Sequence, residues 1–453
     1  MKKRCYWLAG IGVAVVLLTL FCHNRWDAWF YNPPEPAYDA DSVPLRLLLT
    51  FGDSATLSRE VSWQCGTSVQ EANCFYTEAN SGDTLQVAAS GHLFVTAGGQ
   101  CVSYHAKMDG LKKGAAYFYR VQTGRHFSEW YRFEVAAKTD SAFAFTYIGD
   151  VQDNLNGFAR ELLPEIVERY PTDFWVFGGD LTERPHDQYW NEFFAATEQF
   201  RPTTPIVAST GNHEYLKKLP RFLEERFVYT FPYFVSNRET GKAVFSFRYG
   251  DAVFIVLDTN RDFWTLCSQR RWFEKALKET ESAKWRIVVM HHPVFSVRGK
   301  KNNVFVRRAF LPLMEKYNVD LVLAGHEHAY ARRTTVGTDK MPTTPVYVIS
   351  QCSPKDYRIN FKSGYDRYGL MNRFYQIVKI SGDTLHFSAY TERHELYDNL
   401  FIIKSINDNV QIEDKAISWP EILGVDSSRI HIKGDKRLKY EHKIEQRLKK
   451  HNR

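Results

Sequence analysis

Apolar and polar residues alternate along this chain in two different ways. Residues 39–137 contain seven or eight short apolar runs separated by polar turns, without helical periodicity, and this pattern predicts an all-β sandwich. From residue 141 onward, runs of strand character alternate with amphipathic segments such as 156–170, whose apolar residues recur at helical spacing. This second pattern predicts an α/β domain in which helices connect neighbouring strands.

Together these patterns divide the chain into four segments. An N-terminal segment precedes the β-sandwich, and extended runs close the α/β domain before a basic extension begins. The predicted segments are 1–38, 39–138, 141–405 and 406–453. A hydrophobic content of 44% over 453 residues is enough to bury two cores, which excludes a disordered chain and a small disulfide-stabilised scaffold.

The net charge of +7 is concentrated at the C-terminus. Residues 429–453 hold ten of the 59 Lys and Arg and three of the 52 Asp and Glu, so the rest of the chain balances at 49 against 49. A neutral body does not favour nucleic acid as a partner. We expect the tail to be solvated and frayed, although Tyr440, Ile444 and Leu448 stand four apart and would also allow a short amphipathic helix. Contact of the tail with anionic lipid or nucleic acid is a further alternative.

The N-terminus carries a pattern that is typical of exported proteins. Three basic residues at positions 2–4 precede an uncharged, largely apolar stretch at 5–22, as in a secretory signal peptide or a membrane anchor. The stretch is short for a spanning helix and long for a signal core, so its length fits either role. Because no small-residue cleavage site follows, we expect an uncleaved membrane anchor, with the body exported to the periplasmic or extracellular face.

An exported body has consequences for the cysteines. Apart from Cys5 and Cys22, five cysteines remain, and an odd number in an oxidising compartment leaves at least one thiol unpaired within the chain. Cys65 and Cys74 are close in sequence. They could pair with each other or with Cys101, and the spacing does not decide between these pairings.

Five short polar motifs each follow an apolar run of strand character. They are GD at 149–150, GGD at 178–180, GNHE at 211–214, HHP at 291–293 and GHEH at 325–328. Each run should bring its motif to the carboxyl edge of a sheet, which is where ligand sites of α/β folds gather. A single GD is usually a turn, so the prediction of a common site depends on all five motifs occurring together.

The side chains in these motifs indicate a metal centre. Asp and Asn supply hard oxygen ligands and His supplies imidazole nitrogen, a combination that suits Fe, Mn or Zn. Seven or so such ligands are too many for one closed site. Two metal ions that share one bridging carboxylate satisfy this number of ligands.

At these motifs the chain resembles the calcineurin-like metallophosphoesterase superfamily and, within it, the purple acid phosphatases. GHEHAYAR at 325–332 is very similar to their GHxHAYER, and LYDNLFII at 396–403 resembles the end of their catalytic domain. Residues 111–121 resemble a segment of fibronectin type III domains, and purple acid phosphatases carry such a sandwich before the catalytic domain. The resemblance implies an α/β/β/α catalytic domain, with two β-sheets flanked by helices.

The resemblance also implies a ligand set and two divalent ions, which would be Zn, Mn or Fe. One ion would be bound by Asp150, Asp180 and His328, and the other by Asp180, Asn212, His291 and His326. Asp180 would bridge the ions. A metal-bound hydroxide would then attack the phosphate ester in line.

Other residues receive roles around this centre. The resemblance implies that His213 contacts the phosphoryl group and protonates the leaving oxygen, with Glu214 orienting it. His292 is expected to support a ligand or to face the substrate. Arg298 and the neighbouring Lys300 and Lys301 could hold a second phosphate or an acidic substrate, or could form an ordinary solvated loop.

Two positions depart from the purple pattern. Purple acid phosphatases have a ferric-binding Tyr three residues after the second Asp, and this chain has Glu183 there. Many non-purple relatives have His two residues after the first Asp, and this chain has Gln152. Gln152 is expected either to bind a metal or to hydrogen bond to a ligand, and Glu183 to face outward or brace a neighbouring loop. Without the phenolate, we predict a colourless enzyme that uses divalent ions.

The sequence therefore predicts an exported hydrolase that acts on small phosphate monoesters. A phosphodiesterase or a nucleotide pyrophosphatase is the alternative within the same chemistry. An alternative from another class is a surface binding or adhesion protein with an inert phosphoesterase domain, but the predicted ligand set is complete. A nuclease receives no support from the neutral body.

Overall fold

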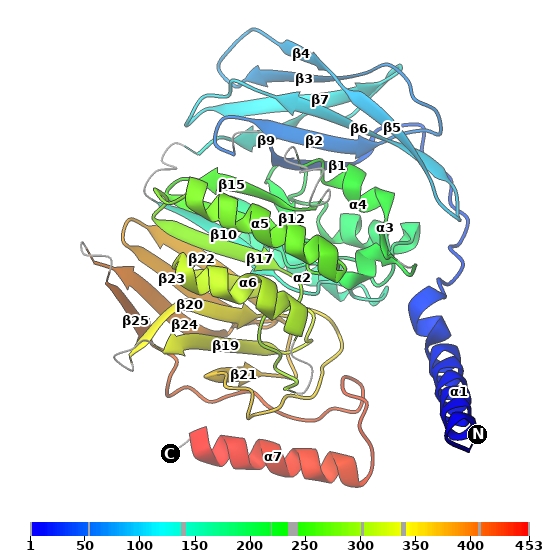
Figure 1. Cartoon of the computed structure of the whole chain (residues 1–453). Coiled ribbons are helices and arrows are strands. Elements are labelled where there is room, and N and C mark those ends of the chain that lie inside the picture. The colour runs from blue at the N-terminus through cyan, green and yellow to red at the C-terminus, as the bar shows by residue number, and fades with distance from the viewer. Residues whose placement is uncertain are drawn as a thin grey trace.

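The structure, a computed structural model, describes most of the chain. The described residues are 2–52, 55–136, 142–218, 220–233, 243–299, 303–336, 341–405 and 409–451. Figure 1 shows an N-terminal helix, a β-sandwich, and a larger α/β part against which the C-terminal helix packs. This is the mixed fold that the two hydrophobic patterns predict.

The β-sandwich follows from the period-two pattern of residues 39–137. One sheet contains β1 (Leu45–Phe51), β2 (Arg59–Gln64), β6 (Gln100–Met108) and β5 (Ser90–Val95) in that order. The other contains β4 (Leu85–Ala88), β3 (Ala72–Glu78), β7 (Ala116–Thr123) and β8 (His126–Phe127), with β9 (Tyr131–Glu134) also paired to β7. Trp63 on β2 is buried between the sheets and donates from its indole nitrogen to Thr123 Oγ1 on β7 at 2.9 Å.

Neither of the cysteine pairings that the sequence left open is formed in the sandwich. Cys65, Cys74 and Cys101 are all buried and free. Cys74 is fully enclosed by the apolar core between the sheets, whereas Cys65 Sγ approaches the Ser42 carbonyl oxygen at 3.3 Å. These cysteines pack as small apolar side chains, and closeness in sequence was therefore a poor guide to pairing.

The α/β part contains two seven-stranded sheets that pack face to face. The first sheet has the order β12 (Ile206–Ala208), β11 (Phe174–Phe177), β10 (Ala142–Ile148), β22 (Phe374–Ser381), β23 (Thr384–Thr391), β24 (Leu396–Lys404) and β25 (Val410–Asp414). The second has the order β15 (Phe245–Tyr249), β16 (Ala252–Leu257), β17 (Trp285–Met290), β18 (Leu321–Ala324), β20 (Pro342–Ile349), β19 (Tyr330–Val336) and β21 (Arg367–Gly369). β10, β11 and β12 are parallel, as are β16, β17, β18 and β20.

Apolar side chains between the sheets form the main core. Phe145 on β10 meets Phe254 on β16 with ring centroids 5.1 Å apart, and each buried aromatic ring contributes about 2–3 kcal/mol by leaving water. The helices are α2 (Phe158–Arg169), α3 (Asp187–Ala196), α4 (Glu225–Thr230), α5 (Phe263–Glu279) and α6 (Val304–Lys316). Figure 1 shows α5 and α6 lying over the second sheet, where Phe273 and Phe310 pack edge to face. A short hairpin joins β13 (Tyr215–Leu216) and β14 (Phe222–Leu223).

The C-terminal region differs from the prediction in two ways. β25 lies beyond residue 405 and is hydrogen bonded to β24, so the sheet continues into the predicted extension. The tail is also not frayed, because it forms the helix α7 (Asp435–His451). Its apolar stripe packs against the body, with Tyr440 and Ile444 each 5% exposed. The stripe of period four therefore determines the structure of the tail, despite its many charges.

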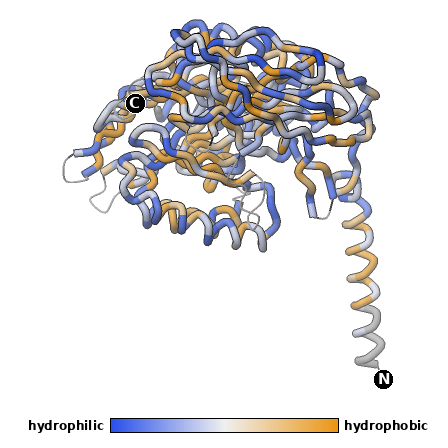
Figure 2. The backbone as a smooth tube through the Cα atoms, turned by 90° about the horizontal axis from the view of Figure 1, so that it is seen from above, coloured by the Kyte–Doolittle hydropathy of each residue, from blue (hydrophilic) through white to orange (hydrophobic). Residues whose placement is uncertain are grey.

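The N-terminal segment forms the helix α1 (Lys2–Phe30), which projects from the body in Figure 2. Within the residues that the structure describes, no helix is long and apolar enough to cross a membrane. The predicted linker is not a free spacer, because the Glu35 carboxylate is buried and pairs with Arg226. Arg226 also donates to Thr96 Oγ1 at 3.0 Å and to the Pro185 carbonyl at 2.9 Å. One guanidinium thereby joins the linker, the sandwich and the α/β part.

Candidate metal centre

The five polar motifs come together at the carboxyl ends of the parallel strands. GD follows β10, GGD follows β11 and GNHE follows β12, while HHP follows β17 and GHEH follows β18. The two sheets thus bring motifs that are far apart in sequence to one edge of the core. This arrangement was predicted from the apolar run before each motif.

Four candidate ligands have a left-handed backbone that is rare for residues with a side chain. The φ angle is 48° at Asp150, 51° at Asp180, 70° at His326 and 43° at His328. Such conformations are unfavourable for residues other than Gly, and they cluster at functional sites. The glycines next to these residues allow close approach, since a Cβ on Gly325 would lie 2.6 Å from Asp150 Oδ2.

Two groups of side chains converge, and they share one carboxylate. Asp180, His291 and His326 form the first group, and Asp150, Asp180 and His328 form the second, with the ligand atoms of each group within 4.8 Å of one another. His291 Nε2 lies 3.2 Å from Asp180 Oδ2 and 3.2 Å from His326 Nδ1. Two such groups with Asp180 in common have the geometry of a dinuclear site.

Asn212 and His213 approach this pair of groups from the loop after β12. Asn212 Oδ1 lies 3.3 Å from His291 Nε2, so its oxygen joins the first group. His213 Nε2 lies 3.9 Å from Asp180 Oδ2, and the side chain is 27% exposed. The other ring nitrogen, Nδ1, contacts the Glu183 carbonyl oxygen. Nε2 is therefore the ring nitrogen on the side of the two ligand groups.

The sequence suggested that Glu214 orients His213, but the structure gives Glu214 a different role. The Glu214 carboxylate is fully buried and accepts hydrogen bonds from the backbone nitrogens of Asp180 at 3.0 Å, Leu181 at 2.8 Å and Gly211 at 2.6 Å. It therefore fixes two ligand loops to each other. No motif signals this role, because it depends on backbone groups of another segment.

Burial and charge perturb the titration of this centre. Burial raises the pKa of Asp150 well above its usual range. Burial alone would do the same to Asp180, but the charges of His291 and His213 hold the pKa of Asp180 well below its usual range. Burial lowers the pKa of His328 to about 3. A divalent cation would stabilise the buried carboxylates and the neutral imidazole together.

Several polar atoms of the centre lack a hydrogen-bond partner within the described part of the chain. They include Asp150 Oδ1, His328 Nδ1 and both polar atoms of the Gln152 carboxamide, all of them buried. Unpaired buried polar atoms are costly in a folded protein. This chemistry fits metal ligation by Asp150 and His328, and it leaves Gln152 available for the same role.

The predicted substrate contacts are only partly gathered at the centre. The centroid of the His292 ring lies 4.0 Å from that of the His326 ring, with the rings tilted by 44°, and His292 Nδ1 lies 3.0 Å from Thr259 Oγ1. Arg298 lies over the ring of Tyr357, with its Cζ 4.6 Å from the centroid. Lys300 and Lys301 lie outside the described residues.

The sequence analysis did not identify two residues that lie next to the centre. The Tyr357 ring lies 4.4 Å from the His328 ring, and Lys355 Nζ binds Glu183 Oε1 at 2.8 Å. Glu183 thus braces a neighbouring loop, which is one of its two expected roles. Both new residues belong to a segment without recognisable motif, so no local signal could have identified them.

Part of the GHEHAYAR motif is structural. Tyr330 and Arg332 both reach the buried carboxylate of Asp398 on β24, at 2.6 Å and 2.7 Å. Arg332 also binds Asp414 on β25 at 2.6 Å. These bonds connect the second sheet to the first, so this half of the motif holds the two sheets together behind the candidate ligands.

Comparisons with known proteins agree with this organisation. Residues 143–330 match the family model of calcineurin-like phosphoesterases, and residues 44–135 match that of the purple acid phosphatase N-terminal domain. The "Probable purple acid phosphatase 20" of Arabidopsis thaliana is 29% identical over 196 residues, which are 41% of this chain and 46% of the relative. The phosphoenolpyruvate phosphatase of Allium cepa is 26% identical over 293 residues, which are 60% of this chain and 59% of the relative.

A solved structure shows the same fold. The purple acid phosphatase PPD1 from yellow lupin seeds has a TM-score of 0.68 at 16% identity, covering 87% of this chain and 78% of that one. The chain spans about half to three fifths of the length of the two plant sequences compared above.

Proposed function

We propose that the chain is a hydrolase that uses two metal ions to cleave phosphate monoesters. It contains a calcineurin-like phosphoesterase domain that follows a purple acid phosphatase N-terminal domain in the sequence. The observation that carries this proposal is the sharing of Asp180 by two convergent ligand groups. An inert binding protein would not need to keep both groups complete. Asp150, Asp180 and His328 would bind one ion, and Asp180, Asn212, His291 and His326 the other.

The bound ions would supply an activated water at neutral pH and positive charge beside the phosphoryl oxygens. The protein positions the remaining groups. The Glu183 carbonyl holds the His213 ring, so His213 Nε2 faces the leaving oxygen and gives it a proton. Glu214 keeps the loops of Asp180 and Gly211 at a fixed separation, which preserves the geometry for in-line attack.

We propose divalent Zn, Mn or Fe as the resident ions. The phenolate position of the purple pattern is occupied by Glu183, and its carboxylate pairs with Lys355. A site of carboxylate, amide and imidazole groups lacks the phenolate that stabilises trivalent iron and gives the purple colour. The purified protein should therefore show no intense visible absorption band.

Monoester specificity and export are also proposals. The relative from Allium cepa is named for a phosphate monoester, which supports the first. The basic residues at positions 2–4 before the uncharged stretch at 5–22 support export.

A substrate panel tests the reaction. The full chain should hydrolyse an activated aryl phosphate, lose this activity on chelation and regain it with added Zn or Mn. The corresponding aryl diester should react at least tenfold more slowly. Equal rates on both esters would contradict monoester specificity, and activity that survives complete metal removal would contradict a metal-dependent reaction.

A further inference from the structure

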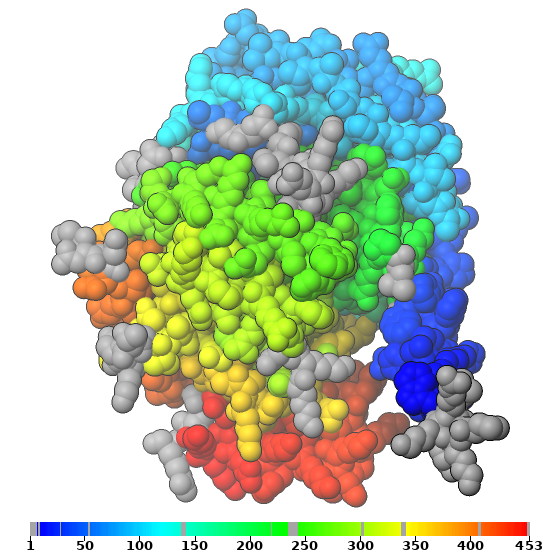
Figure 3. Space-filling model, viewed as in Figure 1, coloured from blue at the N-terminus to red at the C-terminus, as the bar shows by residue number. Residues whose placement is uncertain are grey.

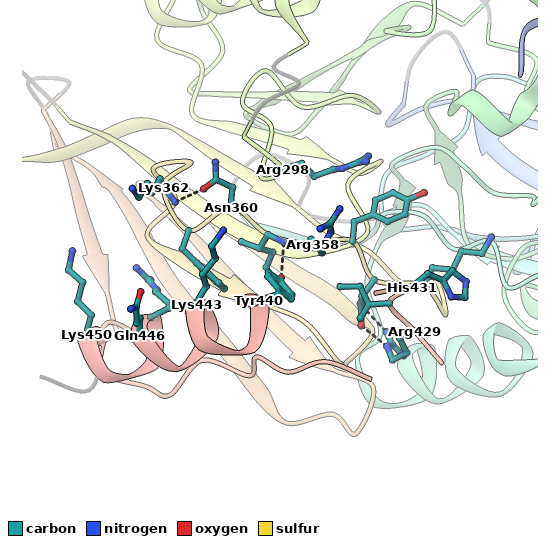
Figure 4. Close-up of a pocket in the computed structure, with 17 residues that line it drawn as sticks. Arg298, Arg358, Asn360, Lys362, Arg429, His431, Tyr440, Lys443, Gln446 and Lys450 are labelled. Carbon is teal, nitrogen blue, oxygen red and sulfur yellow. Dashed lines mark hydrogen bonds and ion pairs between the residues drawn. The ribbon is translucent and has the colours of Figure 1, made fainter. Parts of the chain in front are cut away.

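A large groove lies beside the candidate metal centre, between the C-terminal helix and the second sheet. Its volume is about 1080 Å³, and residues 355–362 and α7 form much of its lining. Figure 3 shows α7 packed along one edge of the α/β part. In Figure 4, Lys443, Gln446 and Lys450 come from α7, while Asn360 and Lys362 come from the opposing segment.

The apolar side of α7 fixes the shape of the groove. Ile359 N donates to the Tyr440 hydroxyl at 2.8 Å, and the rings of Phe361 and Tyr440 stack with centroids 6.4 Å apart. Arg447 binds both oxygens of the buried Glu421 at 2.8 Å. These contacts hold the helix in place, so the cations on its neighbouring turns have defined positions.

The lining is strongly cationic. Asp356 is its only acidic residue, and that carboxylate is already paired with Arg429 at 2.7 Å. Lys355 and Arg447 are likewise paired with carboxylates. Arg298 also lines the groove, and its backbone nitrogen donates to Glu327 Oε2 at 3.2 Å. Four further cations line the groove without a carboxylate partner among the described residues: Arg358, Lys362, Lys443 and Lys450.

The near end of the groove lies against the metal centre. Tyr357 is part of the lining, and its ring lies 4.4 Å from that of the candidate ligand His328. The Arg298 guanidinium lies over the Tyr357 ring. At the far end, Lys443 and Lys450 are two turns of α7 apart, about 10 Å along the helix axis. Cations therefore line the groove from Arg298, next to the centre, to Lys450 at its far end.

We propose that this groove binds the trailing phosphates of an oligophosphate whose terminal phosphate occupies the metal centre. The proposal rests on the proposed function, and it defines the substrate class of the same site. Hydrolysis consumes one water and breaks the bond from the terminal phosphorus to its bridging oxygen. The products are inorganic phosphate and a chain that is one phosphate shorter.

The shape and chemistry of the groove favour this ligand over other polyanions. The unpaired cations line a concave surface, which a thin flexible chain can enter and a flat bilayer cannot. Nucleic acid binding without base readout depends on exposed aromatic rings for stacking. In this groove Tyr440 is 5% exposed, and the half-buried rings of Tyr357 and Phe361 already pack against His328 and Tyr440. Multiple ammonium and guanidinium groups along one path match a chain of phosphates.

The test compares a linear inorganic polyphosphate of about fifteen phosphates, long enough to follow the groove, with an activated aryl phosphate in the full chain. The groove variant is Lys443→Glu combined with Lys450→Glu. The matched control is Lys439→Glu combined with Lys449→Glu, which makes the same charge change on α7 at exposed positions that do not line the groove. A second groove variant, Arg358→Gln with Lys362→Gln, alters the opposite wall and leaves the helix unchanged.

We expect both groove variants to raise the KM for this polyphosphate on the order of tenfold relative to the KM for the aryl phosphate, and the charge effect to weaken with salt. Calorimetric titration with the same polyphosphate in the absence of metal should show a matching loss of affinity. The control variant should change neither quantity. Circular dichroism confirms that α7 remains folded.

Three outcomes would overturn the proposal. The KM ratio could stay unchanged in both groove variants, or the control could shift it equally, which would indicate a general effect of net charge. The groove variants could instead lose binding only to phosphatidylglycerol vesicles, which would assign the cations to a membrane. Absence of aryl phosphate hydrolysis in the parent would refute the proposed function separately, and the metal-free titration would still test the groove.

Discussion

The Glu214 carboxylate gives the most quantitative prediction. Oε2 accepts from the backbone nitrogens of Asp180 and Gly211, and Oε1 accepts from those of Leu181 and Thr182. In Glu214→Gln one oxygen becomes an amide nitrogen, which cannot accept a hydrogen bond. Two buried N–H groups then lose their acceptor and face another donor, whichever oxygen the amide replaces. At about 1–3 kcal/mol for each, we expect a loss of roughly 2–6 kcal/mol in the free energy of unfolding.

Burial and the negative charge of Asp180 raise the pKa of Glu214 to about 7, so the assay belongs at pH 8, where the carboxylate is ionised. Thermal unfolding of metal-free protein should show a midpoint lower by on the order of 10 °C. The metal-free state separates the loss of loop stability from any loss of metal. Glu281→Gln, at an exposed position, is the control. An unchanged midpoint in Glu214→Gln would refute the view that this side chain holds the two loops together.

Three further predictions concern different parts of the molecule. His213→Ala should retain metal but lose on the order of 10²–10⁴ in rate on esters with poor leaving groups, and much less on activated aryl esters; an equal loss on both would contradict its role as the acid. Burial raises the pKa of Glu224 to about 8, so the folded state binds more protons than the unfolded state from about pH 4.5 to 8 and stability falls as pH rises through this window. Urea unfolding of Glu224→Gln should show a flatter pH dependence there, and an unchanged slope would contradict the burial argument. Asp398→Asn should lower the free energy of unfolding by about 3 kcal/mol, because Arg332 loses a buried partner; a urea midpoint equal to that of the parent would contradict a structural role for the motif.

The candidate metal ligands were predictable because each follows a recognisable strand. The apolar runs before Asp150, Asp180 and His291 identify β10, β11 and β17, and parallel strands place their carboxyl ends at one edge. The residue types then indicate the chemistry. The crossover helix α2 was predictable for the same reason, because its apolar residues recur at helical spacing.

Features that depend on partners far apart in sequence were not predictable. Glu35 is 191 residues from Arg226, and neither shows a local pattern that would reveal their buried ion pair. Glu214 binds backbone groups, which leave no trace in residue types. For the tail, the charge content was given too much weight and the apolar stripe of Tyr440 and Ile444 too little, although burial of that stripe outweighs the repulsion between solvated charges.

Metal content in the parent and in Asp180→Asn tests the central claim most directly. After dialysis against buffer without chelator, elemental analysis of the full chain should find about two transition-metal ions in each parent molecule. Asp180→Asn should lose metal and aryl phosphate hydrolysis together, because both ligand groups depend on that carboxylate, whereas Asp83→Asn at an exposed position should match the parent. Two retained ions and full activity in Asp180→Asn would contradict the assignment of Asp180 as the bridge between two metal ions.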